Sequence, residues 1–190
     1  MHRTRIMAGL VVPVAAAGSL VLAPTGAAAH EGGDGDLKEV RMFDDCEQVS
    51  FNRMFGAGTC VGDGETILDE FISQLLATAP SGVPNVDGWE FEPSDVRLDA
   101  DKGLRAVNRG GEFHTFTKVK AFGGGCVDEA PVLSGPQKPV PECKDKDVFE
   151  LTGAPPGHDV VVRGLKAGTH RFECLIHPWM RTTVVVRAHH

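Results

Sequence analysis

The chain has 190 residues, of which 42% are hydrophobic, and its net charge at pH 7 is −7. This length and composition are enough for one well-buried domain with an appendage. The excess of acidic side chains argues against binding to nucleic acid or anionic lipid, because the phosphates of both attract Lys and Arg.

Residues 1–29 have the order of a secretory signal, with Arg3 and Arg5, an apolar stretch to about Ala23, and small residues up to Ala29. We expect cleavage after Ala29, which changes the net charge to −9 and leaves a secreted or periplasmic protein. An uncleaved membrane anchor is the alternative, because the apolar stretch approaches the ~18 residues that a span requires. Pro and Gly residues interrupt the apolar stretch, which favours a cleaved signal over an anchor. The mature protein is then expected to have no membrane segment.

All five cysteines remain after this cleavage, and an exported protein can form disulfides. Sequence proximity favours the pairs Cys46–Cys60 and Cys126–Cys143, each closing a short loop worth ~3 kcal/mol in the chain-entropy treatment. Other connectivities stay open, because proximity is the only basis for these pairs. The pairing leaves Cys174 as a free thiol.

Residues 30–85 are interpreted as an N-terminal extension with a flexible start, the first disulfide loop and a short helix. The first residues of this segment are too polar and Gly-rich to order themselves. From Leu68 onward, apolar side chains recur at i, i+3, i+4, i+7 and i+8, which predicts a helix. Thr66 and Asp69 have the spacing of a capping box at its start.

In residues 86–190, apolar and polar residues alternate as in β-strands, and Gly-containing turns separate these segments. Segments such as 89–92, 115–119 and 159–163 belong to a set of about six to eight short strands without a helical period. This pattern predicts an all-β domain, a Greek-key β-sandwich. The second disulfide, Cys126–Cys143, would constrain the long loop 122–141.

The stretch E-C-L-I-H-P-W-M, residues 173–180, contains a thiol, an imidazole and a thioether at C-x-x-H-x-x-M spacing. Side chains alternate along the preceding strand, so Phe172 and Cys174 share one face, and Phe172 marks that face as interior. Cys174 is therefore expected at the end of a core strand, with His177 and Met180 in the following turn.

A compact metal site needs a second histidine from elsewhere, and His114 at another strand–turn junction is the best candidate. Two imidazoles, a thiolate and a weak thioether are the ligands of a blue-copper electron-transfer centre. This set leaves no open position for a substrate, so it favours electron transfer over catalysis and predicts a protein that is not an enzyme. The plainer alternatives are a structural thiol at Cys174, a surface histidine at His114 and core packing by Met180.

The stretch C-L-I-H-P-W-M, residues 174–180, resembles the ligand loop of the cupredoxins, small blue copper proteins, especially its short amicyanin-like and plastocyanin-like forms. Residues 107–115 resemble the segment that carries the first ligand, and the resemblance covers about residues 86–190. Two features depart from the family: Phe113 replaces the Pro that often precedes the first histidine, and the N-terminal extension is additional.

The resemblance implies one copper ion, cycling between Cu(I) and Cu(II), with the ligands His114, Cys174, His177 and axial Met180. It implies that Thr115 ties the two ligand loops together by hydrogen bonds near the thiolate, with Asn108 as a further supporting residue. Trp179 has two interpretations. It is either cover over the site or, with the edge of His177, part of an apolar patch where a partner docks and the electron leaves.

These features predict an exported, monomeric type 1 copper protein that carries single electrons between redox protein partners. A protein that binds or delivers copper without a redox-carrier role is the alternative, because the ligand set is the same. A multicopper oxidase does not fit, since Glu173 and Leu175 stand where its H-C-H motif has histidines.

Overall fold

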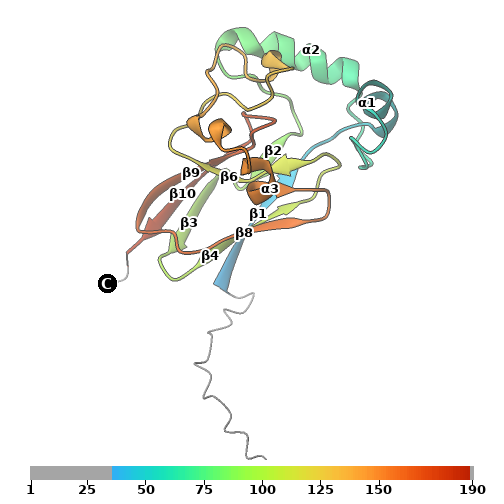
Figure 1. Ribbon diagram of the computed structural model, residues 1–190. Coiled ribbons are helices and arrows are strands. Elements are labelled where there is room, and N and C mark those ends of the chain that lie inside the picture. Colours follow the sequence, from blue (N-terminus) through green and yellow to red (C-terminus); the bar gives the residue numbers. More distant parts are fainter. Residues whose placement is uncertain (1–35, 189–190) are drawn as a thin grey trace, which may run out of the picture. The chain divides into compact units, whose positions relative to one another are not determined.

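The computed structural model describes residues 36–188, which form two β-sheets with helices at one end (Figure 1). The proposed signal at 1–29, the start of the extension and the last two histidines lie outside the described residues. Within residues 36–188, none of the helices is both long enough and apolar enough to cross a membrane.

The strands form two four-stranded sheets and one short pair. The first sheet has the order β2 (Glu90–Glu92), β1 (Leu37–Phe43), β4 (Gly103–Asn108) and β8 (Asp159–Val162). The second has the order β3 (Asp95–Asp99), β10 (Arg181–Arg187), β9 (Gly168–Glu173) and β6 (Thr117–Val119). The short pair is β5 (His114–Thr115) with β7 (Gly153–Ala154).

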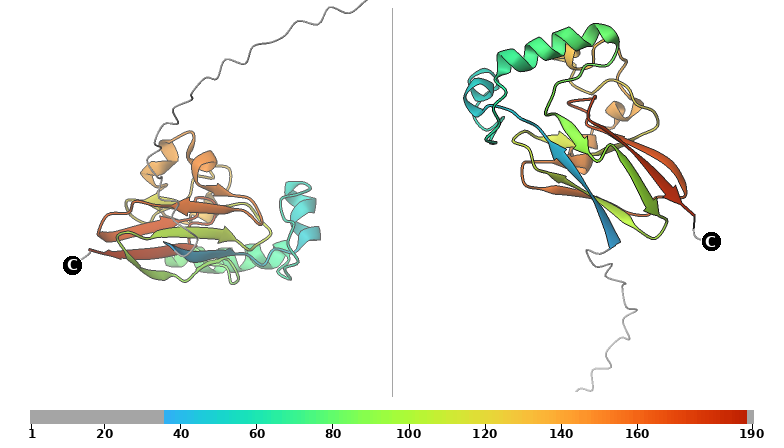
Figure 2. Two further views of the ribbon diagram at one scale, coloured as in Figure 1. Left: turned by 90° about the horizontal axis from the view of Figure 1, so that it is seen from below. Right: turned by 180° about the vertical axis from the view of Figure 1, so that it is seen from behind.

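Helices and turns occupy the connections. The α-helices are α1 (Gln48–Phe55), α2 (Leu68–Thr78) and α3 (Val148–Thr152). Three 3₁₀ turns are η2 (Ala79–Ser81), η3 (Pro131–Leu133) and η4 (Pro141–Lys144). Figure 2 shows α1 and α2 at one end of the sandwich, near the connection from β6 to β7.

The core lies between the sheets, where alternating side chains of both meet. Val96 and Leu98 of β3 and Val184 of β10 are nearly inaccessible, while their neighbours in sequence are partly or fully exposed. The rings of Phe116 and Phe172 stack with centroids 4.5 Å apart. Fully burying such a side chain contributes about 1.5–3 kcal/mol, so this alternation stabilises the sandwich. The predicted all-β sandwich with short helices outside the sheets is confirmed.

Strand β1 lies in the sandwich, although the sequence analysis placed its residues in the extension. It pairs in parallel with β4 and antiparallel with β2, so it is an inner strand of the first sheet. Apolar and charged side chains alternate along this segment, as in a strand with one buried face. Val40 and Met42 are fully buried, whereas Glu39 and Arg41 point outward. Of the described residues in the predicted extension, those outside the sheets therefore belong mainly to the connection between β1 and β2.

Helix α2 forms where the apolar spacing predicts it, but the capping box is wrong. Ile67 occupies the N-cap position and makes no capping hydrogen bond, and the N–H of Leu68 donates to Ser50 Oγ at 3.0 Å. The Thr66 hydroxyl donates instead to Asp45 Oδ2, 2.6 Å away, because Thr66 forms a parallel bridge with Cys46.

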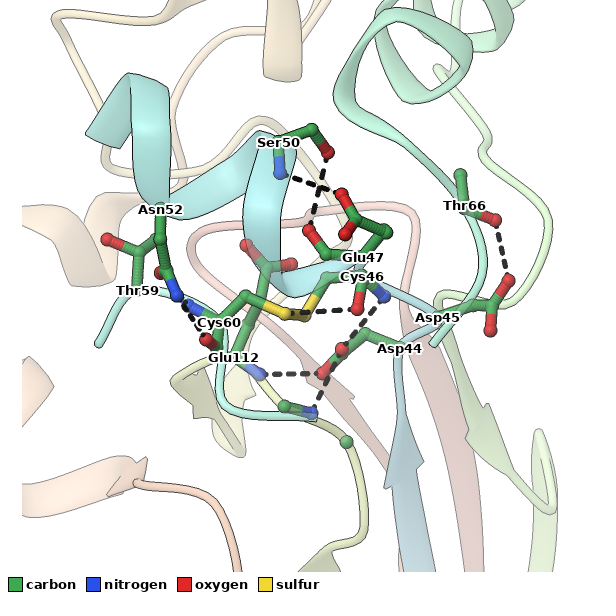
Figure 3. The surroundings of a disulfide bond; sticks show 12 residues. Asp44, Asp45, Cys46, Glu47, Ser50, Asn52, Thr59, Cys60, Thr66 and Glu112 are labelled. Carbon is green, nitrogen blue, oxygen red and sulfur yellow. Dashed lines mark hydrogen bonds between the residues drawn. A yellow bond between two sulfur atoms is a disulfide. The ribbon is translucent and has the colours of Figure 1, made fainter. Parts of the chain in front are cut away.

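Two disulfides fasten the connections, and both are the pairs expected from proximity. Cys46–Cys60 joins the start of α1 to the loop after it, as Figure 3 shows, and Cys126–Cys143 closes the long loop after β6. Among the described residues, Cys174 is the free cysteine, and it is buried.

The place of β1 in the sheet can be tested by truncating one of its buried side chains. We expect Val40→Ala to lower the free energy of unfolding by about 2 kcal/mol, because it leaves a cavity in the core. The control Val185→Ala alters a valine of β10 that is 41% exposed, and its cost should stay below about 0.5 kcal/mol. Urea denaturation measures both values, and equal costs would contradict a core position for β1.

Candidate metal centre

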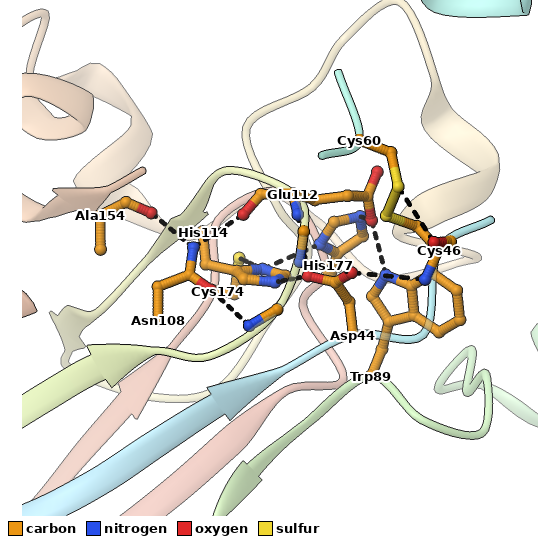
Figure 4. Close-up of polar contacts among 12 residues, drawn as sticks. Asp44, Cys46, Cys60, Trp89, Asn108, Glu112, His114, Ala154, Cys174 and His177 are labelled. Atoms are coloured by element: carbon orange, nitrogen blue, oxygen red, sulfur yellow. Dashed lines mark hydrogen bonds and ion pairs between the residues drawn. A yellow bond between two sulfur atoms is a disulfide. The ribbon is translucent and has the colours of Figure 1, made fainter. Parts of the chain in front are cut away.

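Three side chains from two distant segments converge at one end of the sandwich (Figure 4). One ligand atom each from His114, Cys174 and His177 lies within 4.8 Å of the others, and all three residues are buried. His114 Nδ1 lies 3.8 Å from Cys174 Sγ and 3.4 Å from His177 Nδ1. Two nitrogens and a sulfur thus face one point, which is the arrangement that a single metal ion requires.

The second segment is a tight loop that follows β9. Cys174 comes directly after the last residue of the strand, and its N–H donates to the carbonyl of Met180 at 3.1 Å. The N–H of Met180 donates in turn to the carbonyl of His177 at 2.9 Å. Met180 is buried at the end of this loop, and its role as axial ligand stays a prediction.

The first segment is shaped by Asn108, which is fully buried at the end of β4. Its amide group donates to the carbonyls of Glu112 and Ala154, at 2.7 and 2.8 Å. Its side-chain oxygen accepts from the N–H of Gly110 at 2.9 Å. One side chain therefore satisfies two backbone groups of the loop that leads to His114 and one of β7.

Thr115 joins the two segments. Its N–H points at Cys174 Sγ from 3.5 Å, and its hydroxyl oxygen accepts a 2.8 Å hydrogen bond from the N–H of Leu175. A donor to the sulfur stabilises a thiolate, and the second bond keeps the two loops in register.

Two carboxylate side chains lie beside the Nε2 atoms of the two histidines, and neither was predicted from the sequence. Asp44 Oδ2 lies 2.8 Å from His114 Nε2, and Glu112 Oε2 lies 3.7 Å from His177 Nε2. The same Glu112 oxygen accepts a 2.7 Å hydrogen bond from Trp89 Nε1. A carboxylate on Nε2 fixes the ring and leaves Nδ1 for a metal.

Asp44 also holds the loop that carries Glu112. Its side chain accepts the N–H groups of Gly111 and Glu112, both at 3.0 Å, and is 1% exposed. The sequence offers little sign of this contact, because Asp44 follows β1 and lies 70 positions before His114. Only the parallel pairing of β1 with β4 brings these residues together.

The electrostatics of the centre favour a thiolate beside a charged imidazole. Burial raises the pKa of Cys174, but hydrogen bonds with His114 and His177 outweigh it and hold the pKa well below its ordinary value. Burial lowers the pKa of His114, but hydrogen bonds to Asp44 and Cys174 raise it to about 10. The metal-free site therefore holds a proton on His114 that a metal ion would displace.

Helix α2 covers the His177 side of the centre. The ring of Phe71 lies 6.3 Å from that of His177 and 6.2 Å from that of Trp179. His177 is only 4% exposed and Trp179 only 8%. Both side chains are therefore largely shielded from solvent, and the role of His177 and Trp179 as the electron exit to a partner stays a prediction.

Glu173 is a further buried carboxylate next to the free thiol. The N–H of Gly123 donates to its Oε2 at 3.2 Å, and Arg181 Nε lies 3.5 Å from the same atom. Within the described part of the chain, Oε1 has no hydrogen-bond partner. Burial is the largest influence on this side chain and raises its pKa to about 8.

Comparisons with known proteins give fold likenesses only. No family model matches the chain, and no curated protein matches it in sequence. Among solved structures, a reduced amicyanin variant is 18% identical over 52% of this chain and 73% of its own, with a TM-score of 0.34. Amicyanin from Paracoccus versutus is 17% identical over 54% and 76%, with a TM-score of 0.34. A purple cupredoxin from Nitrosopumilus maritimus is 14% identical over 54% and 86%, with a TM-score of 0.36.

The substitution Glu173→Gln should stabilise the copper-free protein more as the pH rises. The folded chain keeps Glu173 protonated up to about pH 8, against 4.5 for an ordinary glutamate. Between these values folding takes up a proton, so the wild-type protein loses stability with rising pH. Gln does not ionise and avoids this loss, which is on the order of 5 kcal/mol for a pKa shift from 4.5 to about 8.

Urea denaturation of both proteins at several pH values between these limits measures the effect. The stability difference should be smallest at the acidic end and largest near pH 8. A difference that stays constant with pH would contradict a raised pKa at Glu173.

Proposed function

We propose that this chain is an exported mononuclear type 1 copper protein that carries single electrons between redox partners. The observation that supports this most is the convergence of His114 Nδ1, His177 Nδ1 and Cys174 Sγ in a buried cluster. Two imidazoles and a thiolate match the ligand preference of copper in both oxidation states. Met180 in the same loop is the proposed axial ligand.

The residues around the cluster suit a one-electron centre. Copper, when bound, supplies the exchange of a single electron between Cu(I) and Cu(II). Thr115 holds the two loops together, while Asp44 and Glu112 fix the rings of the two histidines. Burial excludes water from the ligand atoms. A site held in this way needs little rearrangement when its charge changes.

A copper-binding or copper-delivery role without electron transport is the second candidate. The observation in its favour is the cover that α2 places over His177, because electron carriers need a short path from the metal to the surface. Repeated oxidation and reduction separates the two roles. A carrier keeps its copper through many cycles, whereas a delivery protein transfers Cu(I) to a competing chelator.

The proposal includes export and a monomeric protein that works with a redox partner protein. Two disulfides within residues 36–188 support export, since such bonds persist in oxidising compartments. The signal-like residues 1–29 agree with this, and they would leave a mature protein that is free of the membrane.

Substitution of the free cysteine tests the metal assignment. The copper-loaded, oxidised protein should have an intense visible absorption band that disappears on reduction, and Cys174→Ser should lack the band because the thiolate produces it. The control His158→Ala changes an exposed turn histidine and should keep the colour. An unchanged spectrum in Cys174→Ser would refute a copper–thiolate centre.

Substitution of the carboxylate behind His114 tests the support of the site. Asp44→Asn should weaken copper binding by about 10–100-fold, because a neutral amide orients and polarises His114 less well. The neighbouring Asp45→Asn is the control, since Asp45 bonds Thr66 and the N–H of Glu65 and has no contact with either histidine. Competition with a chelator gives the affinities, and circular dichroism verifies the fold. Equal affinities of the two variants would exclude a positioning role for Asp44.

A further inference from the structure

An apolar cleft of about 370 Å³ lies beside the candidate metal centre. One wall comes from α1 and α2 and the other from the loop after β6, including η3. At its rim are Phe55, Ile72 and Val132, which are 59%, 39% and 38% exposed. Its deeper side chains, such as Leu75, are almost fully buried, so the cleft leads from the surface into the protein.

Two polar groups lie among these deeper residues, and both belong to the candidate centre. Glu112 is 7% exposed and His177 is 4% exposed, and both line the cleft. The contacts of the Glu112 carboxylate with Trp89 and His177 use Oε2. Because the Glu112 side chain lines the cleft, its carboxyl group can accept a hydrogen bond from a ligand bound there.

The size and chemistry of the cleft limit what it can bind. Its volume falls at the lower end of the range for small-molecule sites, about 300–1,000 Å³, and it has the usual apolar walls with few polar groups. The aromatic rings of Phe55 and Phe71 favour a flat apolar ligand. The described residues that line the cleft include no Lys or Arg that would attract an anion, and the carboxyl group of Glu112 favours a ligand that donates a hydrogen bond.

We propose that this cleft binds a small neutral aromatic molecule whose hydroxyl group donates a hydrogen bond to Glu112. This inference goes beyond the proposed copper function and does not depend on it, because the cleft and the Glu112 oxygen belong to the chain itself. The bound molecule would contact His177, so its binding would also change the surroundings of the candidate metal centre.

Three probes of similar size test the chemistry on the mature, disulfide-bonded and copper-free protein. Phenol carries the donor, toluene lacks it and benzoate is an anion. In titrations followed by ligand-observed NMR, phenol should bind saturably, toluene about tenfold more weakly and benzoate not detectably, because one hydrogen bond to a charged group is lost or replaced by repulsion.

Three variants locate the binding. Ala130→Phe fills the cleft and should abolish phenol binding, whereas Ala167→Phe, in an exposed turn between β8 and β9, should leave it unchanged. Glu112→Gln should bring phenol and toluene to within about threefold of each other, since the charged acceptor is lost.

Three results would overturn the inference. They are the absence of phenol binding, equal affinities for all three probes, and phenol binding that survives Ala130→Phe. Because the protein is copper-free, these results are independent of the optical test of the metal centre. A colourless copper-loaded protein would refute the proposed function and leave the cleft proposal standing.

Discussion

The arrangement of the centre depends on the hydrogen-bonded ion pair between Asp44 and His114. Both side chains are almost completely buried, and removing one partner of such a pair typically costs about 3–5 kcal/mol because a buried charge is left behind. The pair is possible only because β1 lies beside β4 and ends level with the loop after it. Asp44 also holds the N–H groups of that loop, so strand, loop and histidine form one unit.

The segment between β1 and β2 changes the character of the site. It brings Phe71 against His177 and Trp179 and so covers this side of the candidate centre. The same segment forms one wall of an apolar cleft that is also lined by Glu112 and His177. The segment therefore both shields the candidate centre and provides an entrance beside it with the size of a small molecule.

The sequence predicted what depends on local pattern. The spacing from Cys174 to Met180, the strand alternation and the helical stripe of α2 are each readable within a few residues. Of the contacts between distant segments, the approach of His114 to Cys174 and His177 and the link through Thr115 were predicted, whereas the carboxylates beside the histidines were not. Asp44 and Glu112 follow no spacing rule relative to the histidines, and β1 was missed because its Val40 and Met42 stand in a charged stretch next to the extension. The capping box failed because Thr66 found a tertiary partner in Asp45.

The disulfide between Cys46 and Cys60 lies two residues beyond Asp44 and ties down the start of α1. Its formation therefore fixes the backbone that positions Asp44 beside His114 and α2 over His177. Under the proposed copper function, disulfide formation would precede metal binding. A newly made chain with reduced thiols would then capture copper poorly, and metal loading would follow in the compartment where the disulfide can form.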